Sequence, residues 1–276
     1  VLQLDGADYF RFRQLSLEST SSVYSRVIFL FNGASYNEWT GNIVTGPNLT
    51  STGTNQALVY STSTDDEYNV FRYNRFVEGS YGIYLIGTNT ANTERGTVIE
   101  YNAFRGQYYM GIRFLYQDAP RVSYNTIVGN SVYCCSYYGV YTNSCQNDWT
   151  YLGNTLTDID HGFGFYFTNT DGSPTARGLL ANNFVSVGQG ASRASYGIYL
   201  TASDYNDIYY NSVRVESSNG SSRAFFLAGN ETRVKNNIFA NFNQGHAYYK
   251  QSGNNLETDF NALYAPQATL AYWDGS

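Results

Sequence analysis

An asparagine that is followed two residues later by an aliphatic residue or Phe recurs along almost the whole chain. The nine copies are Asn42, Asn74, Asn102, Asn125, Asn154, Asn183, Asn211, Asn237 and Asn261. They are separated by 32, 28, 23, 29, 29, 28, 26 and 24 residues. A recurrence in this range is typical of repeat architectures. The repeat therefore constrains the shape of the molecule more than any other feature.

A second motif lies between the asparagines and reads small residue, apolar, aromatic, apolar. Its clearest copies are Gly82-Ile83-Tyr84-Leu85 and Gly197-Ile198-Tyr199-Leu200. Such alternation predicts a strand with one buried face. Because turns of Asn, Gly, Ser and Thr separate the motifs, we expect two strands in each period and no helix.

A parallel β-helix satisfies both motifs. Turns of about 25 residues that stack at a strand spacing of about 4.8 Å give an all-β solenoid of about ten coils. We expect one domain over residues 1–276. Val1-Leu2-Gln3-Leu4 already reads as a strand, and terminal repeats need polar caps, so we expect a segment of a longer secreted chain or neighbours at both ends.

Two sets of apolar residues should form columns inside this solenoid. The first set consists of Ile83, Leu85, Ile112, Phe114, Phe165, Phe167, Ile198, Leu200, Phe225 and Leu227. The second set consists of Val44, Phe76, Phe104, Ile127, Leu156, Val185, Val213, Phe239 and Leu263. The asparagines suit a tight corner, because Asn tolerates the left-handed backbone region and its amides can bond to one another along the axis.

Composition excludes several classes of function. The chain is rich in tyrosine, with 28 copies, and charged residues make up only 14% of it. The net charge of −6 argues against a nucleic-acid partner, which needs a clustered basic face. No apolar run is long enough to insert into a membrane.

The three cysteines fall within one repeat. Cys145 could form a disulfide with either Cys134 or Cys135, and an odd thiol remains in both cases. Their spacing is not that of a zinc site with paired ligands.

The chain resembles secreted bacterial right-handed parallel β-helix proteins, especially cargo of type IX secretion. The resemblance rests on residues 4–12, Tyr81-Gly82-Ile83-Tyr84-Leu85, residues 207–213, residues 234–241 and residues 259–264. It implies the fold and export to the cell surface. The wider superfamily includes pectate lyases, other polysaccharide lyases, glycoside hydrolases and rods without a known reaction, so the fold does not select an activity.

The outward position of the second motif predicts an aromatic ladder on a solvent-facing sheet. Its members are Phe29, Val59, Tyr84, Arg113, Tyr141, Tyr166, Tyr199, Phe226 and Tyr249. Flat amphipathic rings suit a sugar-binding surface, and a contiguous apolar stripe also suits contact with another protein or a second rod. The alternative is that the rings stack only to stabilise the sheet.

The most catalytic-looking cluster is Asp158-Ile159-Asp160-His161. Asp158 and Asp160 alternate, so both could face one way, and His161 could act as a base near neutral pH. Two carboxylates and a proton shuttle suit glycoside cleavage. The alternative is that the cluster is a turn between coils, where Asp is common.

Acidic residues in two other places suggest ion binding and ion pairing. Asp65-Asp66-Glu67 could hold Ca²⁺, which prefers clustered oxygen ligands, although a solvated loop is the alternative. We expect no other cofactor. Two residues before the repeat asparagines, Arg72 should pair with Glu100 and Lys235 with Asp259, each pair contributing at most about 1 kcal/mol.

The sequence therefore favours a non-enzymatic rod at the bacterial cell surface, serving in structure or adhesion through its aromatic ladder. Its expected partners are surface polysaccharide or copies of itself, with which it could form a filament through free strand edges. A polysaccharide lyase or hydrolase is the first alternative, and a glycan-binding module without catalysis is the second.

Overall fold

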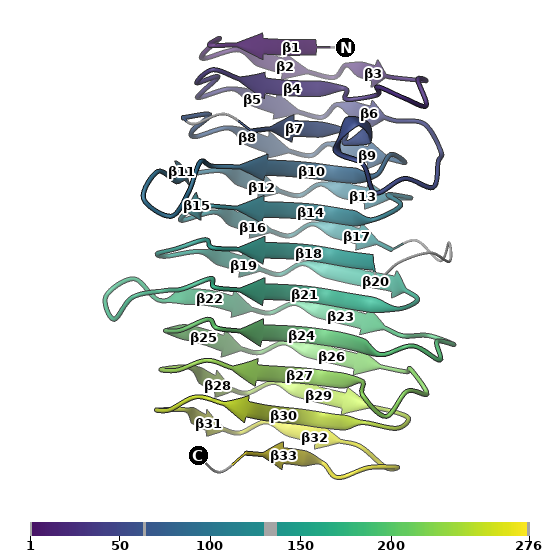
Figure 1. Ribbon diagram of the computed structural model, residues 1–276, viewed down its shortest axis with the longest axis vertical. Coiled ribbons are helices and arrows are strands. Elements are labelled where there is room, and N and C mark those ends of the chain that lie inside the picture. Colours follow the sequence, from purple (N-terminus) through teal and green to yellow (C-terminus); the bar gives the residue numbers. More distant parts are fainter. Residues whose placement is uncertain (1, 63–64, 130–136, 275–276) are drawn as a thin grey trace.

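The computed structural model describes residues 2–62, 65–129 and 137–274, which form a parallel β-solenoid. Every pairing between strands of successive coils is parallel. The chain runs along one sheet, returns behind it along two others and steps toward the C-terminus, which makes the solenoid right-handed (Figure 1). The predicted all-β parallel β-helix is confirmed.

Sheet A has eleven strands and the longest ones of the molecule, facing the viewer in Figure 1. It consists of β1 (Leu2–Asp5), β4 (Ile28–Phe31), β7 (Val59–Ser61), β10 (Tyr81–Ile86), β14 (Met110–Leu115), β18 (Tyr137–Asn143), β21 (Gly162–Thr168), β24 (Ser195–Thr201), β27 (Arg223–Ala228), β30 (His246–Ser252) and β33 (Ala271–Trp273).

Sheet B follows sheet A in each coil and has ten short strands. It consists of β2 (Arg11–Arg13), β5 (Glu38–Thr40), β8 (Val70–Arg72), β12 (Val98–Glu100), β16 (Arg121–Ser123), β19 (Thr150–Leu152), β22 (Gly178–Ala181), β25 (Asn206–Tyr209), β28 (Arg233–Lys235) and β31 (Glu257–Asp259).

Sheet C completes each coil, also with ten strands. It consists of β3 (Ser16–Glu18), β6 (Ile43–Thr45), β9 (Arg75–Val77), β13 (Ala103–Arg105), β17 (Thr126–Val128), β20 (Thr155–Ile159), β23 (Phe184–Val187), β26 (Ser212–Val215), β29 (Ile238–Asn241) and β32 (Ala262–Tyr264). A two-stranded sheet of β11 (Glu94–Arg95) and β15 (Gln117–Asp118) and a 3-10 turn, η1 (Thr54–Gln56), lie in the connections.

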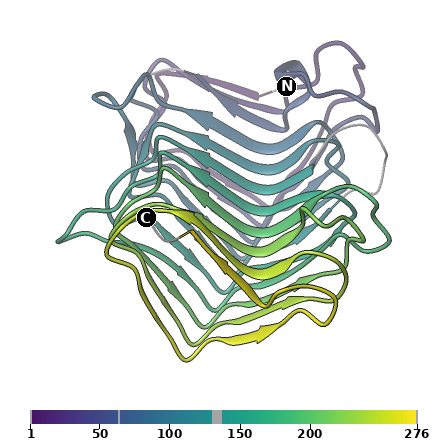
Figure 2. The ribbon, with the colours of Figure 1, turned by 60° about the horizontal axis from the view of Figure 1, so that its bottom comes forward.

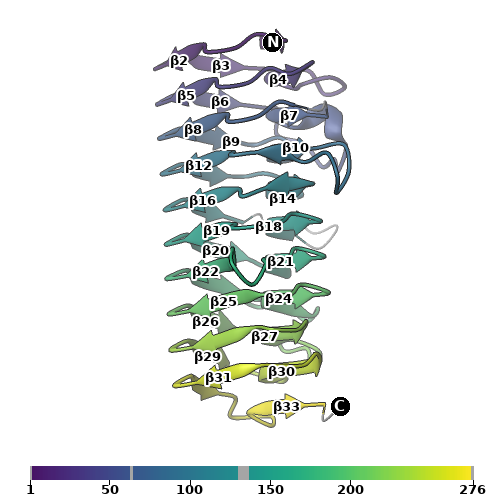
Figure 3. The same cartoon turned by 90° about the vertical axis from the view of Figure 1, so that its left-hand side faces the viewer.

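Each coil thus has three strands, and the expectation of two was wrong. Figure 2 shows the three sides of the stacked coils, and Figure 3 shows sheets A and B as separate ladders. Strands such as β8 and β9 are only three residues long and lie on either side of Asn74. An alternation of only three residues cannot be distinguished from a turn in the sequence. The sequence analysis therefore predicted one strand where the structure has a strand of sheet B, a corner and a strand of sheet C.

The asparagines lie inside the corner between sheets B and C and bond to one another along the axis. The Nδ2 of Asn125 donates to Oδ1 of Asn154 at 3.0 Å and to the carbonyl of Ile99 at 2.8 Å. The backbone N–H of Asn125 donates to the same Oδ1 at 3.0 Å. This pattern continues from Asn42 to Asn261, so the predicted amide ladder is confirmed.

The left-handed backbone at this corner belongs to the residue before each asparagine, contrary to the expectation. Tyr73, Tyr101, Tyr124 and Tyr210 have φ between 56° and 57° there. This conformation turns the chain, and the side chain of the following asparagine points inward. The corner therefore needs the asparagine for its amide and not for its backbone freedom.

The core consists of the predicted columns, which lie behind sheets A and C. Ile83, Ile112, Phe165, Ile198 and Phe225 have no exposed surface. In the second column Phe76, Phe104 and Leu156 are equally buried, whereas Leu263 in the last coil is only partly buried. Sheet B adds a third column that the sequence analysis missed, and it includes Trp39, Phe71, Ile99, Val122, Tyr151, Leu180, Ile208 and Val234.

Candidate binding face

The outer face of sheet A carries the predicted aromatic ladder with one change of register. The strand pairing runs through Phe29, Tyr60, Tyr84, Arg113, Tyr141, Tyr166, Tyr199, Phe226, Tyr249 and Tyr272. Tyr60 takes the place expected for Val59, which is fully buried. The expectation failed because Val59 aligns with the inward Ile28 and Ile83.

Six rings form a continuous stack from β18 to β33. The centroid distances between successive rings of Tyr141, Tyr166, Tyr199, Phe226, Tyr249 and Tyr272 are 5.2, 5.0, 4.0, 5.6 and 4.5 Å. Their planes are within 12° of parallel. Since the rings stack along the solenoid axis, each ring face lies against a neighbour and each ring edge points outward.

A second column of rings lies beside this stack on the same face. Tyr138, Phe163 and Tyr196 stack on one another at 5.0 and 4.8 Å. Phe163 meets Tyr166 edge-to-face at 4.8 Å, and Tyr196 meets Tyr199 edge-to-face at 5.2 Å. The two columns therefore brace each other, and each such ring pair contributes about 0.5–1.5 kcal/mol.

Arg113 interrupts the ring stack in the middle of the sheet. Its guanidinium carbon lies 4.5 Å from the ring centroid of Tyr84 and 5.3 Å from that of Tyr141, in cation–π geometry. One Nη donates to the hydroxyl of Tyr81 at 3.4 Å. Burial raises the pKa of Tyr81 to about 12 although Arg113 opposes the rise, so this phenol stays protonated at neutral pH.

One end of the second column carries a charged side chain. Arg223 pairs in register with Tyr196 and His246, and its guanidinium lies 4.5 Å from the ring centroid of Tyr249. His246 continues the column of Tyr196 and Arg223, and its Nδ1 is 2.9 Å from the carbonyl of Thr269. Near the other end of the sheet, Arg26 lies 3.8 Å from the ring centroid of Tyr60.

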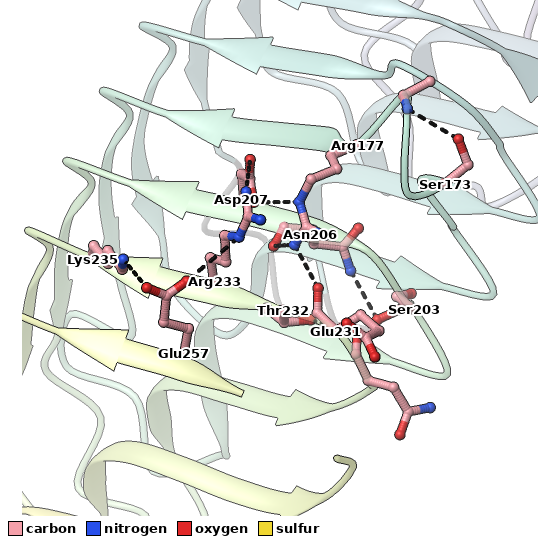
Figure 4. Close-up of polar contacts among 12 residues, drawn as sticks. Ser173, Arg177, Ser203, Asn206, Asp207, Glu231, Thr232, Arg233, Lys235 and Glu257 are labelled. Carbon is pink, nitrogen blue, oxygen red and sulfur yellow. Dashed lines mark hydrogen bonds and ion pairs between the residues drawn. The ribbon is translucent and has the colours of Figure 1, made fainter. Parts of the chain in front are cut away.

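Ion pairs concentrate on sheet B. The expected pair of Arg72 and Glu100 forms, at 3.1 Å. Lys235 pairs with Glu257 and not with Asp259, because Glu257 opposes Arg233 on the neighbouring strand, and its longer side chain reaches both cations. Figure 4 shows this cluster.

The same cluster continues toward β22 through Asp207, which joins two arginines. Arg177 donates to Asp207 at 2.7 Å, and Arg233 is 3.8 Å from the same carboxylate (Figure 4). Arg177 also donates to the carbonyls of Asn206 and Glu231. Its charge is thus compensated on several sides.

The structure sets Asp158 apart from the other two catalytic candidates. A register shift between Leu156 and Ile159, with φ of 56° at Asp158, breaks the alternation that would place Asp158 and Asp160 on one side. Asp160 lies 3.6 Å from Nδ1 of His161, beside a hollow of about 60 Å³. His161 is only 4% exposed. Whether Asp158, Asp160 or His161 takes part in catalysis remains a hypothesis.

The expected calcium ligands also differ in environment. Asp66 is buried and accepts the backbone N–H of Ala34 at 2.7 Å, whereas Asp65 is exposed with φ of 71°. Asp66 lies instead near a buried carboxyl, Glu94, to which Gln117 donates at 2.6 Å. Burial raises the pKa of Glu94 to about 8. In residues 2–62, 65–129 and 137–274, no three His, Cys, Asp or Glu side chains gather around a possible metal position.

Cys145 is buried with a free thiol, and burial raises its pKa to about 12. Cys134 and Cys135 lie outside the described residues, and with them the expected disulfide.

A polar hollow of about 440 Å³ lies where the chain leaves sheet A in later coils, and the sequence analysis missed it. Asp171, Asp204 and Asn230 line it. The carboxylate of Asp171 accepts the N–H of Asp204 at 2.8 Å, and Asp204 accepts the N–H of Asn230 at 2.7 Å. Loss of hydration, with the nearby Asp204, raises the pKa of Asp171. The sequence signal for this hollow is the series Asp171, Asp204 and Asn230 at the same corner of successive coils. It can be recognised only once the register of the strands is known.

The three stacked sheets and the ring columns on sheet A define the protein as a parallel β-solenoid with an aromatic outer face. The sequence also matches the profile of a known family. The profile of the family described as "Periplasmic copper-binding protein (NosD)" matches residues 92–264. The chain belongs to the NosD family. No curated protein matches the sequence.

The described residues do not fit the copper site that the family description implies. Copper prefers imidazole, thiolate and thioether ligands. Cys145 is a buried thiol, and the two histidines, His161 and His246, lie in β-coils separated by β24 and β27. We therefore derive no chemistry from copper.

The fold is similar to that of solved β-helix structures. The Dettilon tailspike protein (gp208) aligns with a TM-score of 0.60 and 16% identity over 93% of this chain and 55% of the tailspike. The A-module of the Azotobacter vinelandii mannuronan C-5 epimerase AlgE6 aligns with a TM-score of 0.40 and 12% identity over 97% of this chain and 90% of the module. The chain thus spans about half of the tailspike. No described segment forms a helix long and apolar enough to cross a bilayer.

Proposed function

We propose that this protein is a non-catalytic extracellular β-solenoid that contacts surface polysaccharide through the outer face of sheet A. The observation that carries the proposal is the stack of six rings between Tyr141 and Tyr272. Most of these rings are only half-buried, so their edges and phenol groups remain available. Rings with a polar tip supply contact area at low entropic cost.

Burial keeps the phenol groups of this face in the donor form. It raises the pKa of Tyr138 and of Tyr199 to about 12, and it raises the pKa of Tyr166. A row of protonated hydroxyls at successive coils matches the hydroxyl and ring oxygens of an extended sugar chain. Export to the cell surface belongs to the same proposal, and the family's periplasmic description supports its first step, export from the cytoplasm.

The test compares two pairs of tyrosines. The Tyr166→Ser, Tyr199→Ser double variant should weaken binding to the recognised polysaccharide by about tenfold in affinity gel electrophoresis, as expected for truncated aromatic anchors. The matched control is Tyr73→Ser, Tyr101→Ser, whose rings stack at 5.1 Å on the corner between sheets B and C. It should bind like the wild type. Equal binding by both variants, with only lower melting temperatures, would leave the rings a purely stabilising role.

Self-association through the same face is the other outcome of that test. Sedimentation velocity would then show larger species for the wild type that the sheet A variant loses and the control retains. That result would replace polysaccharide by a second copy of the chain as the partner.

A second candidate function is polysaccharide cleavage in the hollow of Asp171 and Asp204. The raised pKa of Asp171 favours it, since one carboxyl of a cleaving pair must hold a proton. Asp171→Asn should then abolish release of reducing ends from a cleaved polysaccharide, whereas Asp160→Asn should not. Unchanged release by Asp171→Asn would exclude the hollow as the active site.

A further inference from the structure

We infer that the sheet A face binds an acidic polysaccharide, carboxylated or sulfated, and that Arg113 is the central contact to its anionic groups. The inference rests on the proposed function and specifies the ligand class. Three independent observations on this face support it: its charge, the orientation of its rings, and the contacts of Arg113.

The face has the opposite charge to the molecule as a whole. The chain carries a net charge of −6. Among the described strands of sheet A, however, the only acidic residue is Asp5 at the end of β1. Arg26, Arg113 and Arg223 all lie against the rings of this sheet. Sheet B, by contrast, carries several acidic groups, of which Glu38, Glu100, Asp207 and Glu257 pair with cations.

Ring orientation on this face favours an anion over a stacked neutral sugar. A sugar that packs on an aromatic residue needs an open ring face. Here the faces of Tyr166 and Tyr199 are occupied by their neighbours, at 5.2, 5.0 and 4.0 Å. What remains outward is the ring edge, which carries the positive end of the quadrupole, together with the phenol O–H donors. Ring edges, phenols and guanidinium groups all attract oxygen anions.

Arg113 is a half-buried arginine whose contacts within the described chain compensate little of its charge. Its one hydrogen bond goes to the Tyr81 hydroxyl, and no described carboxylate lies within ion-pair distance. Its Nε is shielded from solvent without a hydrogen-bond partner among the described residues. Arg177, by contrast, bonds to Asp207 and two carbonyls. A cation that is partly desolvated by Tyr84 and Tyr141 gains strongly from an external anion.

The two other arginines suggest how the ligand lies. Arg26 precedes β4, and Arg223 begins β27, so Arg113 on β14 lies between them along the axis. β4 and β14 are three strand spacings apart, and β14 and β27 are four. At about 4.8 Å per spacing, the charges recur at roughly 15 to 20 Å. An extended polymer that runs parallel to the axis can reach all three, whereas a single sugar cannot.

Polymers with one backbone and different charge test the inference directly. The probes are dextran, carboxymethyl-dextran and dextran sulfate, with binding of the full 276-residue chain measured by biolayer interferometry at several salt concentrations. We expect binding to one or both charged polymers, little to dextran, and a loss of affinity as salt increases. The carboxymethyl and sulfate arms distinguish the two anion types.

Arg113→Gln should lower the affinity for the charged polymer by about tenfold, the loss expected for one charge-assisted contact, and should flatten the salt dependence. Arg113→Lys should retain part of the affinity, because it keeps the charge but not the planar fork. The control is Arg121→Gln, an exposed arginine on sheet B for which no ion pair forms among the described residues. It should bind like the wild type. If Arg113→Gln unfolds, the Arg26→Gln, Arg223→Gln double variant replaces it with the same expected loss.

Several results would overturn the inference. Equal losses in Arg113→Gln and Arg121→Gln would mean that only net charge matters, and equal binding of single-stranded DNA would mean a general polyanion surface. Binding of dextran that Arg113→Gln leaves unchanged would overturn the acidic ligand but leave the proposed polysaccharide contact intact. Failure to bind any polysaccharide would remove both.

Discussion

At the scale of single residues, the amide ladder gives the clearest example of a side chain that replaces backbone structure. Each inner asparagine satisfies one N–H and one carbonyl of neighbouring coils at a corner where no strand ladder reaches them, as Asn125 does for Asn102 and Ile99. Buried backbone groups need such partners. The corner therefore depends on an amide, which has both a donor and an acceptor.

We predict that Asn125→Ala lowers the free energy of unfolding by roughly 2–4 kcal/mol, because several buried polar groups lose their partners at once. The same change at Asn261 should cost less than half as much, since this last member of the ladder is only partly buried and water can replace its bonds. Urea denaturation of both variants measures the difference. Equal losses would contradict the buried-ladder explanation.

Glu94 predicts a pH dependence of stability. Its pKa in the folded chain is about 8, above the ordinary 4.5, because burial disfavours the charged form. Between these two pH values the folded chain binds more protons than the unfolded chain, so stability falls as pH rises. The slope is about 1.4 kcal/mol per pH unit while only the folded form is protonated.

Glu94→Gln should flatten this slope, because the amide keeps the size of the side chain without titrating. Urea unfolding at a series of pH values measures it, and Glu18→Gln, at an exposed position, is the control that should retain the wild-type slope. A Glu94→Gln variant with an unchanged slope would show that another group causes the dependence.

At the scale of elements, sheet A needs a residue without a side chain between its two aromatic columns. A Cβ at Gly164 would lie 2.4 Å from Cγ1 of Val185 and 2.5 Å from the carbonyl oxygen of Gly197. The strand approaches its neighbours this closely because ring columns lie outside it and the apolar column lies inside.

Gly164→Ala should therefore destabilise the chain by about 1–3 kcal/mol through overpacking. Gly220→Ala is the matched control, because its new methyl group meets only Oε1 of Gln244 at 3.7 Å. This variant should be within about 0.5 kcal/mol of the wild type. Differential scanning calorimetry of the two variants distinguishes local overpacking from a general effect of replacing glycine by alanine.

At the scale of the whole molecule, the strands of each coil pair only with those of the coils before and after it, and stability should vary along the axis. In β31 and β33 every residue is exposed, whereas the inward residues of β21 and β24 are fully buried. Solenoid stability is a sum of repeat and interface contributions, so terminal repeats open most easily.

We predict that amide hydrogen exchange is slowest in β14, β18, β21 and β24 and at least about tenfold faster in β31–β33. Mass spectrometry of peptic fragments measures this profile. Uniform protection along the chain would indicate that all coils unfold together or that the ends are covered by neighbouring molecules.

Part of the architecture was predictable because it repeats. A short pattern that recurs at one position of every coil is unambiguous, so the asparagines and the Gly-Ile-Tyr-Leu motifs predicted the solenoid, both apolar columns and most of the aromatic ladder. Sheet B was not predictable, because strands such as β8 contain one inward residue between two outward ones. The placement of Val59 failed because the small residue Ala57 lies one position too early, and Leu58 occupies the place that Gly82 has in the next coil.

The sequence by itself determined the parallel β-helix and two of its three inner columns, since stacking coils bury the apolar positions that recur in every coil. Only the tertiary structure decided which side chains on the outer surface of the solenoid contact one another. It turned the ring faces toward one another, left Arg113 without a carboxylate partner among the described residues, directed Lys235 to Glu257 and gathered Asp171 and Asp204 around one hollow. These contacts join residues about 20 to 35 positions apart, and the loops between the coils, which vary in length, set their register. A repeat therefore specifies what is inside, whereas the binding chemistry depends on side chains that only the stacked coils bring together.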